Sequence, residues 1–468
     1  MSDSVISSSA AALVPWDRDF SIRTYRLDIL RRVLDGSLYS SLQYRFDQER
    51  SDSGNYIPLR ERQPSVRYPL ARIVVEDSVA LLFSESHFPA VFCKDEVINE
   101  ALAIILKDVN ANAIMIEAAW RGSVGSVAIL LRVLGGRLFL DVLDSLYLTP
   151  EWDISSPDRL VEVTELYKVA GAELVGRGYT VDDPNVTYWF RRVWSQEEEI
   201  WYLPCKIGGN VPHLIDYQRT VAHGFGFVPI IWIKNLPGGD RVDGGCTFSA
   251  AIDTSMEIDY QLSQAGRGLK YSSDPTLLIK EPAGFDGTVI KGAANALVVS
   301  EKGDAKLLEI GGSASEAVIN YVRTLREFAL ESMHGNRVDS SRLATPASGR
   351  SLELMNQGLL WLADNLRISY GEGALIALSR MILRATKKYS ISINQRNFSN
   401  LDSTVSLGLL WPPWYPSDSL DRQRDATTLI QLVSAGQLSR ETALRILAPE
   451  YDIEDLISER RHLAKEAN

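Results

Sequence analysis

The chain is poor in the residues that build disulfide, redox and metal sites. Its 468 residues include three cysteines, Cys93, Cys205 and Cys246, which are odd in number and far apart. This spacing excludes a disulfide framework and a CxxC metal knuckle, so we expect small core residues in a reducing compartment. The five histidines lie in separate segments, without a second histidine or a cysteine at metal spacing. We therefore expect no metal site and no cofactor.

Long apolar runs and an excess of basic charge are also missing. No stretch approaches 18 uninterrupted apolar residues, so no transmembrane span is expected, and residues 1–13 predict a flexible tail rather than a signal peptide. The net charge is -11. Proteins that grip DNA phosphates normally present a basic face, so this charge argues against tight wrapping of nucleic acid. It still allows a conduit, which works better if DNA does not adhere to it.

Signatures of catalysis are absent as well. The sequence has no Walker A, HExxH or GxSxG motif. The glycine-rich stretches Gly122–Gly125 and His223–Gly226 lack the context of a dinucleotide-binding fingerprint and predict turns. Carboxylates on amphipathic helices and at strand ends are commonly solvated, and we interpret the following residues in this way: Asp141, Asp144, Asp253, Glu257 and Asp259. We expect no catalytic residues and no enzymatic activity.

The hydrophobic content of 45% and the charged content of 23% are typical of a globular protein, and the length predicts several packed units. Apolar periodicity predicts helices over 21–36, where Gly36 can end the helix, and over 95–109. Residues 48–66 are charged and interrupted by proline and glycine, which favours a mobile loop. Residues 72–83 are apolar and predict a buried segment, with helix or strand left open.

From about 112 to 235 the pattern changes to a β-rich α+β region. Gly135 and Gly136 stand where a hairpin turn is expected. Short β-branched and aromatic runs alternate with turn residues and predict strands over Ala113–Ala119, Val127–Val133, Arg137–Val142, Glu162–Lys168, Thr187–Val193, Glu199–Leu203 and Val228–Ile233.

Two long helices, flanking a small β-rich module, follow in the sequence. The first is predicted over 248–272, short strands over 276–311, and the second helix from Ser313, where Glu316 completes a capping box. Residues 334–349 lack an apolar period and predict a loop.

The longest helical pattern covers about 350–388, where Gly371 and Gly373 predict a kink or break. The Trp/Pro cluster of 411–416 cannot be helical and marks a boundary. Helices follow it, with Gly436 ending the first of them and Ser439 capping a second.

The order of these segments resembles the portal proteins of tailed bacteriophages, in the SPP1-like and HK97-like group. Stretches similar to the family's patterns occur in order over roughly 20–450: residues 71–85 (ARIVVEDSVALLFSE), 223–229 (HGFGFVP) followed by Ile230–Ile233 and Asn235, 244–249 (GGCTFS), 348–352 (SGRSL), 411–413 (WPP) with 416–418 (PSD), and 435–442 (AGQLSRET). The tail and the loop over 48–66 have no counterpart in that pattern.

The resemblance implies an α+β subunit that assembles as a ring, usually of twelve copies. It divides the chain into an N-terminal wing part (1–247), a stem helix (248–272), a clip (273–312), a second stem helix (313–333), a tunnel loop (334–348), a long wing helix (349–385), a C-terminal wing part (386–416) and a helical crown (417–468). Arg337 and Arg342, on the tunnel loop, are then the candidates for contact with DNA in the channel.

The resemblance also implies a place and partners. The ring would be assembled in the host cytoplasm and would occupy the unique capsid vertex of a virion, without contact with a membrane. It would serve packaging and ejection of double-stranded DNA and would bind the major capsid protein, the terminase large subunit and a head–tail adaptor protein. Two alternatives stay open: another ring or adaptor protein of the virion, and a hydrolase without a recognisable motif.

Overall fold

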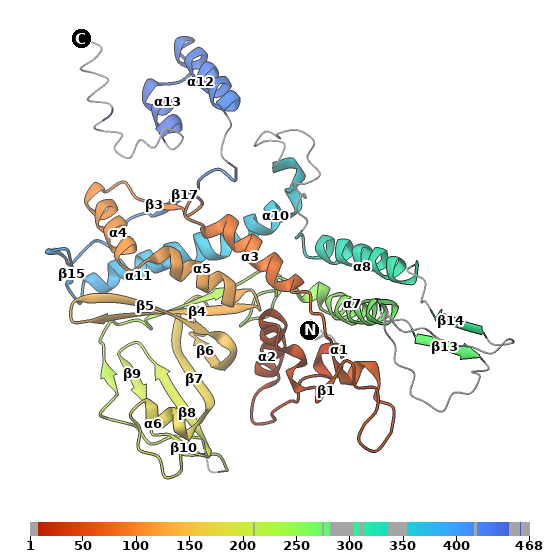
Figure 1. Ribbon diagram of the computed structural model, residues 1–468. Helices are drawn as coiled ribbons and strands as arrows, with labels where there is room; N and C mark the ends of the chain where they lie inside the picture. The colour runs from red at the N-terminus through yellow and green to blue at the C-terminus, as the bar shows by residue number, and fades with distance from the viewer. Residues whose placement is uncertain are drawn as a thin grey trace.

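The computed structural model shows an α+β body from which a two-helix arm projects, with a pair of helices near the C-terminus (Figure 1). It describes residues 8–208, 211–273, 276–280, 304–308, 313–335, 353–415, 419–448 and 459. Within these residues no helix is both long enough and apolar enough to cross a lipid bilayer.

Most of the core lies where a layer of helices meets a small sheet. The helices of this layer are α2 (Ile22–Asp35), α3 (Leu70–Phe83), α4 (Glu96–Asp108), α5 (Ala111–Gly122), α10 (Gln357–Leu366) and α11 (Ile376–Thr386). The predictions for 21–36 and 95–109 are confirmed, with Gly36 in the left-handed conformation at the end of α2. The segment 72–83, left open between helix and strand, is helical.

The strand predicted over Ala113–Ala119 is wrong, because these residues belong to α5. Met115, Ala118 and Ala119 are buried, at a spacing that places them on one face of a helix against the sheet. The two isoleucines in this run suggested a strand, and tertiary burial of the alanine-rich face decides for a helix.

A three-stranded antiparallel sheet lies under this layer, in the order β12 (Ile230–Lys234), β4 (Ser126–Leu134) and β5 (Arg137–Asp144). Gly135 and Gly136 connect β4 to β5 with φ of 57° and 78°. Both values are positive, as a two-residue type I′ turn requires, so the hairpin prediction is confirmed.

A second, distal sheet hangs below the first in the view of Figure 1. Its strands run in the order β11 (Val221–Ala222), β9 (Glu198–Trp201), β8 (Thr187–Trp194), β7 (Leu160–Ala170) and β6 (Leu148–Trp152), with β10 (Cys205–Lys206) paired to β8. The helix α6 (Gly171–Gly176) follows β7, and the 3-10 turn η3 (Ser145–Tyr147) links β5 to β6. Trp194 is fully buried and packs with residues of both sheets.

The N-terminal segments pack beside the root of the arm. They comprise α1 (Ser8–Ala11), η1 (Leu38–Ser41), β1 (Tyr44–Arg45), η2 (Leu59–Glu61) and β2 (Arg62–Gln63). The mobile loop predicted over 48–66 is wrong at Arg62, which is only 1% exposed. Its guanidinium donates to the carbonyl oxygens of Ile57 at 2.9 Å and Phe46 at 3.4 Å, and these bonds fasten the segment from inside.

The arm consists of the two long helices that the sequence predicted. A 3-10 turn, η4 (Ser249–Ala251), leads into α7 (Ile252–Ser273), and α8 (Ser313–Ser332) packs along it. The antiparallel strands β13 (Thr276–Lys280) and β14 (Asp304–Leu308) pair at the far end of the arm (Figure 1). The predicted helices and short strands are thus confirmed as elements.

The long helix after the arm departs from α-helical geometry at Gly371 and Gly373, where a kink or break was predicted, but the helix is not broken there. A π-helical segment, Arg367–Leu375, joins α10 to α11 without interruption. Three short strand pairs complete the body: β15 (Ile391–Ile393) with β16 (Arg396–Phe398), and β17 (Gly408–Leu410) with β3 (Ala90–Phe92), besides β1 with β2.

The C-terminal helices are α12 (Ser419–Ser434) and α13 (Arg440–Leu447). Gly436 has a φ of 67° after the first, and the Ser439 side chain accepts a bond from the Thr442 amide at the start of the second, as predicted.

Candidate functional site: the arm and its anchors

The root of the arm is organised around a buried carboxylate. Asp259 of α7 is 5% exposed and accepts hydrogen bonds from the Tyr39 hydroxyl at 2.9 Å and from the Tyr68 backbone amide at 2.7 Å. Burial raises the pKa of Asp259 to about 6, although both hydrogen bonds favour the ionised form. The interpretation of this residue as part of a solvated face is therefore wrong.

Tyr68 extends this contact to the second arm helix. Its hydroxyl oxygen accepts a hydrogen bond at 2.9 Å from Nε of Arg326, which belongs to α8. A further tie comes from Ser263 of α7, whose hydroxyl accepts from the Val66 amide at 3.0 Å. The segment just before α3 therefore bonds to both helices and sets the direction in which the arm leaves the body.

One apolar stripe of α8 faces α7 and the body. Ala329 is fully buried, and Val322 and Leu325 pack partly buried against the main core. The adjoining flank of α8 carries large apolar side chains that are exposed, with Tyr321 at 48% and Phe328 at 61%. These two residues are seven positions apart and therefore lie on one face of the helix.

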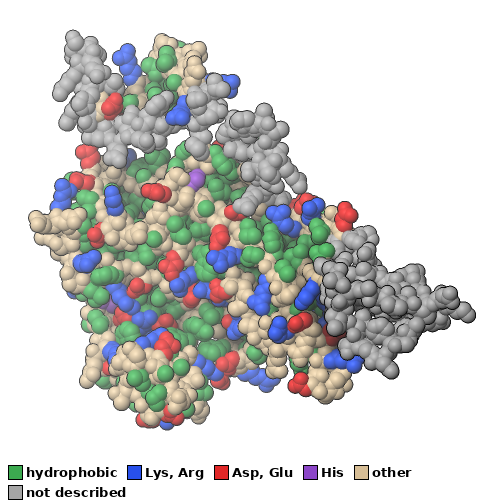
Figure 2. Space-filling view, viewed as in Figure 1, with side chains coloured by type: hydrophobic (Ala, Val, Ile, Leu, Met, Phe, Trp, Pro, Cys, Tyr) green, Lys and Arg blue, Asp and Glu red, His purple; other side chains and the backbone are tan. Residues whose placement is uncertain are grey.

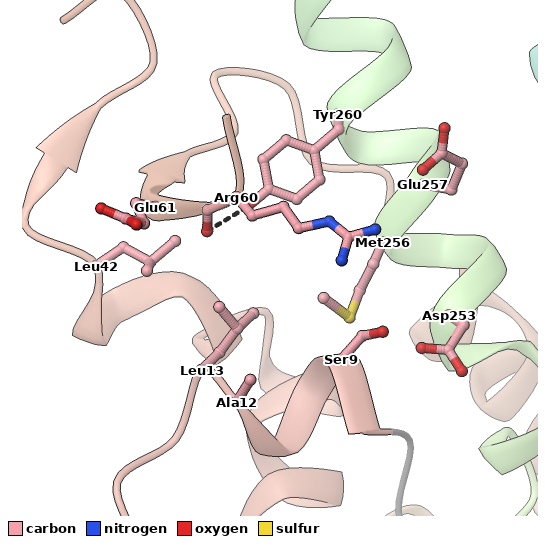
Figure 3. Close-up of a pocket in the computed structure, with 10 residues that line it drawn as sticks. All are labelled: Ser9, Ala12, Leu13, Leu42, Arg60, Glu61, Asp253, Met256, Glu257 and Tyr260. Atoms are coloured by element: carbon pink, nitrogen blue, oxygen red, sulfur yellow. Dashed lines mark hydrogen bonds between the residues drawn. The ribbon is translucent and has the colours of Figure 1, made fainter. Parts of the chain in front are cut away.

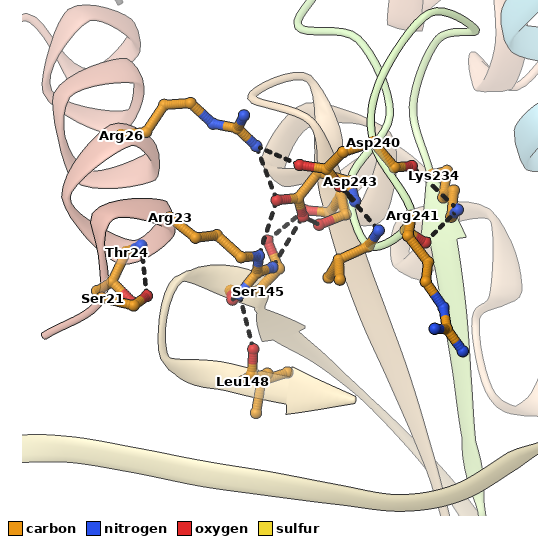
Figure 4. A network of polar contacts seen from close by, with 12 residues as sticks. Ser21, Arg23, Thr24, Arg26, Ser145, Leu148, Lys234, Asp240, Arg241 and Asp243 are labelled. Atoms are coloured by element: carbon orange, nitrogen blue, oxygen red, sulfur yellow. Dashed lines mark hydrogen bonds and ion pairs between the residues drawn. The ribbon is translucent and has the colours of Figure 1, made fainter. Parts of the chain in front are cut away.

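A second buried carboxylate, that of Asp243, fastens α2 to the three-stranded sheet and to the distal sheet (Figure 4). Asp243 has a side chain 1% exposed and pairs in a bidentate manner with Arg23, at 2.7 and 2.8 Å. Arg26 donates to it at 2.9 Å and the Ser126 hydroxyl at 2.5 Å. Arg23 also donates to the carbonyl oxygens of Ser145 and Leu148, so α2, β4 and the start of β6 share one network.

Before the chain leaves the body for α12, its Trp/Pro segment packs against Arg367 of the π-helical segment. The guanidinium carbon of Arg367 lies 3.1 Å from the ring centroid of Trp414 and 4.5 Å from that of Trp411. Burial lowers the pKa of Arg367 to about 10, which leaves it charged at neutral pH. His87 contacts the Trp414 carbonyl oxygen through Nε2 at 3.0 Å. The Trp/Pro segment is thus held from the π-helical segment and from the turn that follows α3.

Gly371 explains why the π-helical segment accepts this contact. A Cβ at this position would lie 2.3 Å from Cζ2 of Trp411, which is closer than van der Waals contact allows. The residue directly before Gly371, Tyr370, is fully buried, and its hydroxyl donates to the side-chain oxygen of Asn235 at 3.1 Å. The π-helical segment thus buries the Tyr370 ring in the body, and the Trp411 ring packs against it at Gly371.

The residues predicted as sites lie in different places. Arg337 and Arg342 fall outside the described residues. Asp144 pairs with Arg31 at 2.7 Å, and Asp141 pairs with Arg132 at 3.3 Å. No group of three or more possible metal ligands among His, Cys, Asp and Glu is found in the described part of the chain.

The glycine-rich stretches form turns, with Gly224 and Gly226 at positive φ, and His223 precedes them as expected. Burial lowers the pKa of His223. The three cysteines are half-buried, and burial raises the pKa of Cys246 to about 12.

Comparison with known proteins leaves the function to be argued from this geometry. No family model matches the chain, and no curated protein matches it. Among solved structures, a chain from the "Virion of native gene transfer agent (GTA) particle" matches with a TM-score of 0.37 and 12% identity, over 81% of this chain and 88% of that chain. A likeness at this level carries no argument about what the protein does.

Proposed function

We propose that this chain is the subunit of a portal-type ring, through which double-stranded DNA enters and leaves a viral capsid. The observation that carries the proposal is the two-helix arm with a strand pair at its tip, followed in the chain by a long helix of the body (Figure 1). The sequence stretches that resemble portal proteins also follow one another along this chain in the order that the portal family has.

Exposed apolar faces on the arm and on the long helix support assembly with further copies. Leu354, Trp361 and Ile368 are 64%, 56% and 64% exposed and recur every seven residues. Large apolar side chains in such rows are costly in water and are typical of surfaces that bury against a partner. In a ring, each copy supplies a neighbour for this face through a heterologous contact.

The acidic composition fits a conduit that does not bind its cargo tightly. A net charge of -11 repels phosphates on average, and a few cations then supply weak guidance that depends on salt. Arg337 and Arg342 are the proposed cations of the channel. The chain itself performs no catalysis in this proposal, and a separate ATPase drives the DNA.

The proposed division of labour follows the segments. The strand pair at the tip of the arm, within 273–312, docks the terminase large subunit during packaging and a head–tail adaptor protein later. The wing, 1–247 with 386–416, faces the major capsid protein, and the crown, 417–468, faces the capsid interior. The ring would occupy the portal vertex of the virion.

Native mass spectrometry and negative-stain microscopy of the purified chain test this proposal. We expect an annular assembly, with twelve copies as the number that the resemblance implies. The double substitution Trp361→Glu with Ile368→Glu should reduce the assembly to single copies, because it charges the exposed stripe without touching the core. Ile154→Glu, at a position 93% exposed on the distal module, is the matched control and should leave the ring intact. A chain that stays a single copy in all conditions, or that hydrolyses nucleotide or ester substrates on its own, would refute the proposal.

A further inference from the structure

One face of α7 lines two grooves that lie end to end. The first, about 510 Å³, includes Asp253, Glu257 and Tyr260, and the second, about 590 Å³, includes Ser263, Arg267 and Lys270. Steps of three and four residues place these positions on one side of the helix. The stripe from 253 to 270 is about 26 Å long at the rise of an α-helix.

The first groove is apolar at its base and acidic at its rim (Figure 3). Leu13, Leu42 and Met256 supply the apolar surface. Three carboxylates, those of Glu61, Asp253 and Glu257, line this groove together with one guanidinium, that of Arg60. This end of the stripe therefore favours a segment with basic side chains around an apolar one.

The second groove has the opposite charge. Arg45, Arg267 and Lys270 line it together with Asp47. Arg45 pairs with Asp47 at 3.4 Å and Arg267 pairs with Glu49, so the groove with these partners has one positive charge in excess. Gly266 leaves the helix surface bare at its centre, since a Cβ there would meet nothing within 4 Å. This end of the stripe therefore favours acidic side chains.

The boundary between the grooves is rigid. The Tyr260 hydroxyl contacts the carbonyl oxygens of Arg60 at 3.3 Å and Arg62 at 3.2 Å, and the Arg62 side chain is itself buried. Both grooves are thus bounded by the same segment of chain. A ligand that spans them therefore binds with a small loss of conformational entropy in the site.

We propose that this face of α7 binds a single polypeptide segment of a partner protein, basic at one end and acidic at the other. A second copy of this face is excluded as the occupant, because two concave surfaces do not fill one another. Nucleic acid is disfavoured, because its phosphates would meet the three carboxylates of the first groove. The inference concerns a single chain and does not depend on the proposed ring.

Two synthetic helical peptides of 17 residues and of equal composition can test the surface. One has its lysines at one end, its glutamates at the other and leucines between, and the other has the same charges alternating along its length. Fluorescence anisotropy with the full-length protein should show at least tenfold tighter binding of the first peptide. Equal affinity for both peptides, or competition by duplex DNA as strong as by unlabelled peptide, overturns the proposal.

Charge reversal in the protein gives a sharper test. Glu257→Lys and Lys270→Glu should each weaken binding of the first peptide three- to tenfold, because the first cancels the acidic excess of one groove and the second cancels the basic excess of the other. The double variant should bind the two peptides with equal affinity, because neither groove then keeps an excess of its original charge. Glu327→Lys on exposed α8 is the matched control and should change nothing. All three side chains are exposed, so thermal melting should be unchanged; a double variant that still prefers the first peptide as strongly as the wild type contradicts the proposal.

Discussion

The backbone amide of Tyr68 donates to the carboxylate of Asp259 at 2.7 Å, and this bond fixes the first arm helix to the segment that precedes α3. The same carboxylate is 5% exposed, and burial raises its pKa to about 6. The arm is therefore anchored by a group that changes its charge in the range of mildly acidic solutions. In the proposed ring, all arms would share this property.

Asp259→Asn should remove one component of the pH dependence of stability. The pKa of Asp259 is about 6 in the folded chain, against an ordinary value of 3.8 for a solvated aspartate. The folded state therefore holds the proton more tightly, and its free energy of unfolding falls as the pH rises from about 4 to 7. A shift of this size corresponds to about 3 kcal/mol. Chemical denaturation of both proteins across this range measures the effect.

The quantity to compare is the stability of the wild type minus that of Asp259→Asn. We expect this difference to decrease with rising pH, because only the wild type must ionise a buried group. Asp253→Asn, at an exposed position of the same helix, is the control and should not reproduce this decrease. A flat difference would mean that burial does not raise the pKa of Asp259, and a rising one would mean that its hydrogen bonds outweigh burial.

Gly371→Ala should destabilise the body, while Gly373→Ala should not. The added methyl group at 371 would lie 2.3 Å from the Trp411 ring, and overpacking of this kind costs about 1–3 kcal/mol. Gly373 is exposed in the same π-helical segment, and a Cβ there would meet only the Ile368 carbonyl oxygen, at 3.3 Å. Thermal denaturation of the two variants checks the contrast. Equal melting temperatures would contradict the packing of Trp411 on this glycine.

Asp243 and Arg23 should be strongly coupled in a double-mutant cycle. Asp243→Ala leaves the Arg23 and Arg26 guanidinium groups without their buried partner, which should cost about 3–5 kcal/mol. Arg23→Met made in the same background should cost less than it does alone, with a coupling of about 1–3 kcal/mol. Urea denaturation gives all four stabilities. Additive losses would mean that the bidentate pair contributes nothing beyond its separate members.

Sequence patterns correctly predicted the helix ends, helix caps and hairpin turn, because their conformation depends on residues that are close in the sequence. Gly36, Gly135 and Gly436 adopt positive φ where the sequence placed a helix end or a hairpin turn. Ser439 caps its helix as expected, and the two arm helices appear over the predicted ranges. In each case the determining contacts lie within a few residues, so sequence patterns are sufficient.

The anchors could not be predicted in this way, because their partners are distant in the sequence. Asp259 is bonded by Tyr39, 220 positions away, and by Tyr68, 191 positions away. Arg62 stood in a charged stretch typical of a loop, yet it is buried. A charged residue appears solvated in a sequence unless its partner is known. The Trp/Pro cluster signalled a boundary, but not that Arg367 would lie against both indole rings.

Arg337→Ala and Arg342→Ala should change how DNA packaging responds to salt, if these residues line the proposed channel. Each substitution removes one cation that attracts phosphates, so packaging efficiency and DNA retention should become less sensitive to ionic strength. Ser340→Ala, in the same stretch, keeps the charge and should behave as the wild type. The rival account is that the arginines pair with Asp339 of a neighbouring copy. Asp339→Asn would then reproduce the arginine variants in ring stability, measured by dissociation in denaturant, while packaging by intact rings would keep its salt dependence. Packaging and retention that match the wild type at every salt concentration would remove both arginines from the channel.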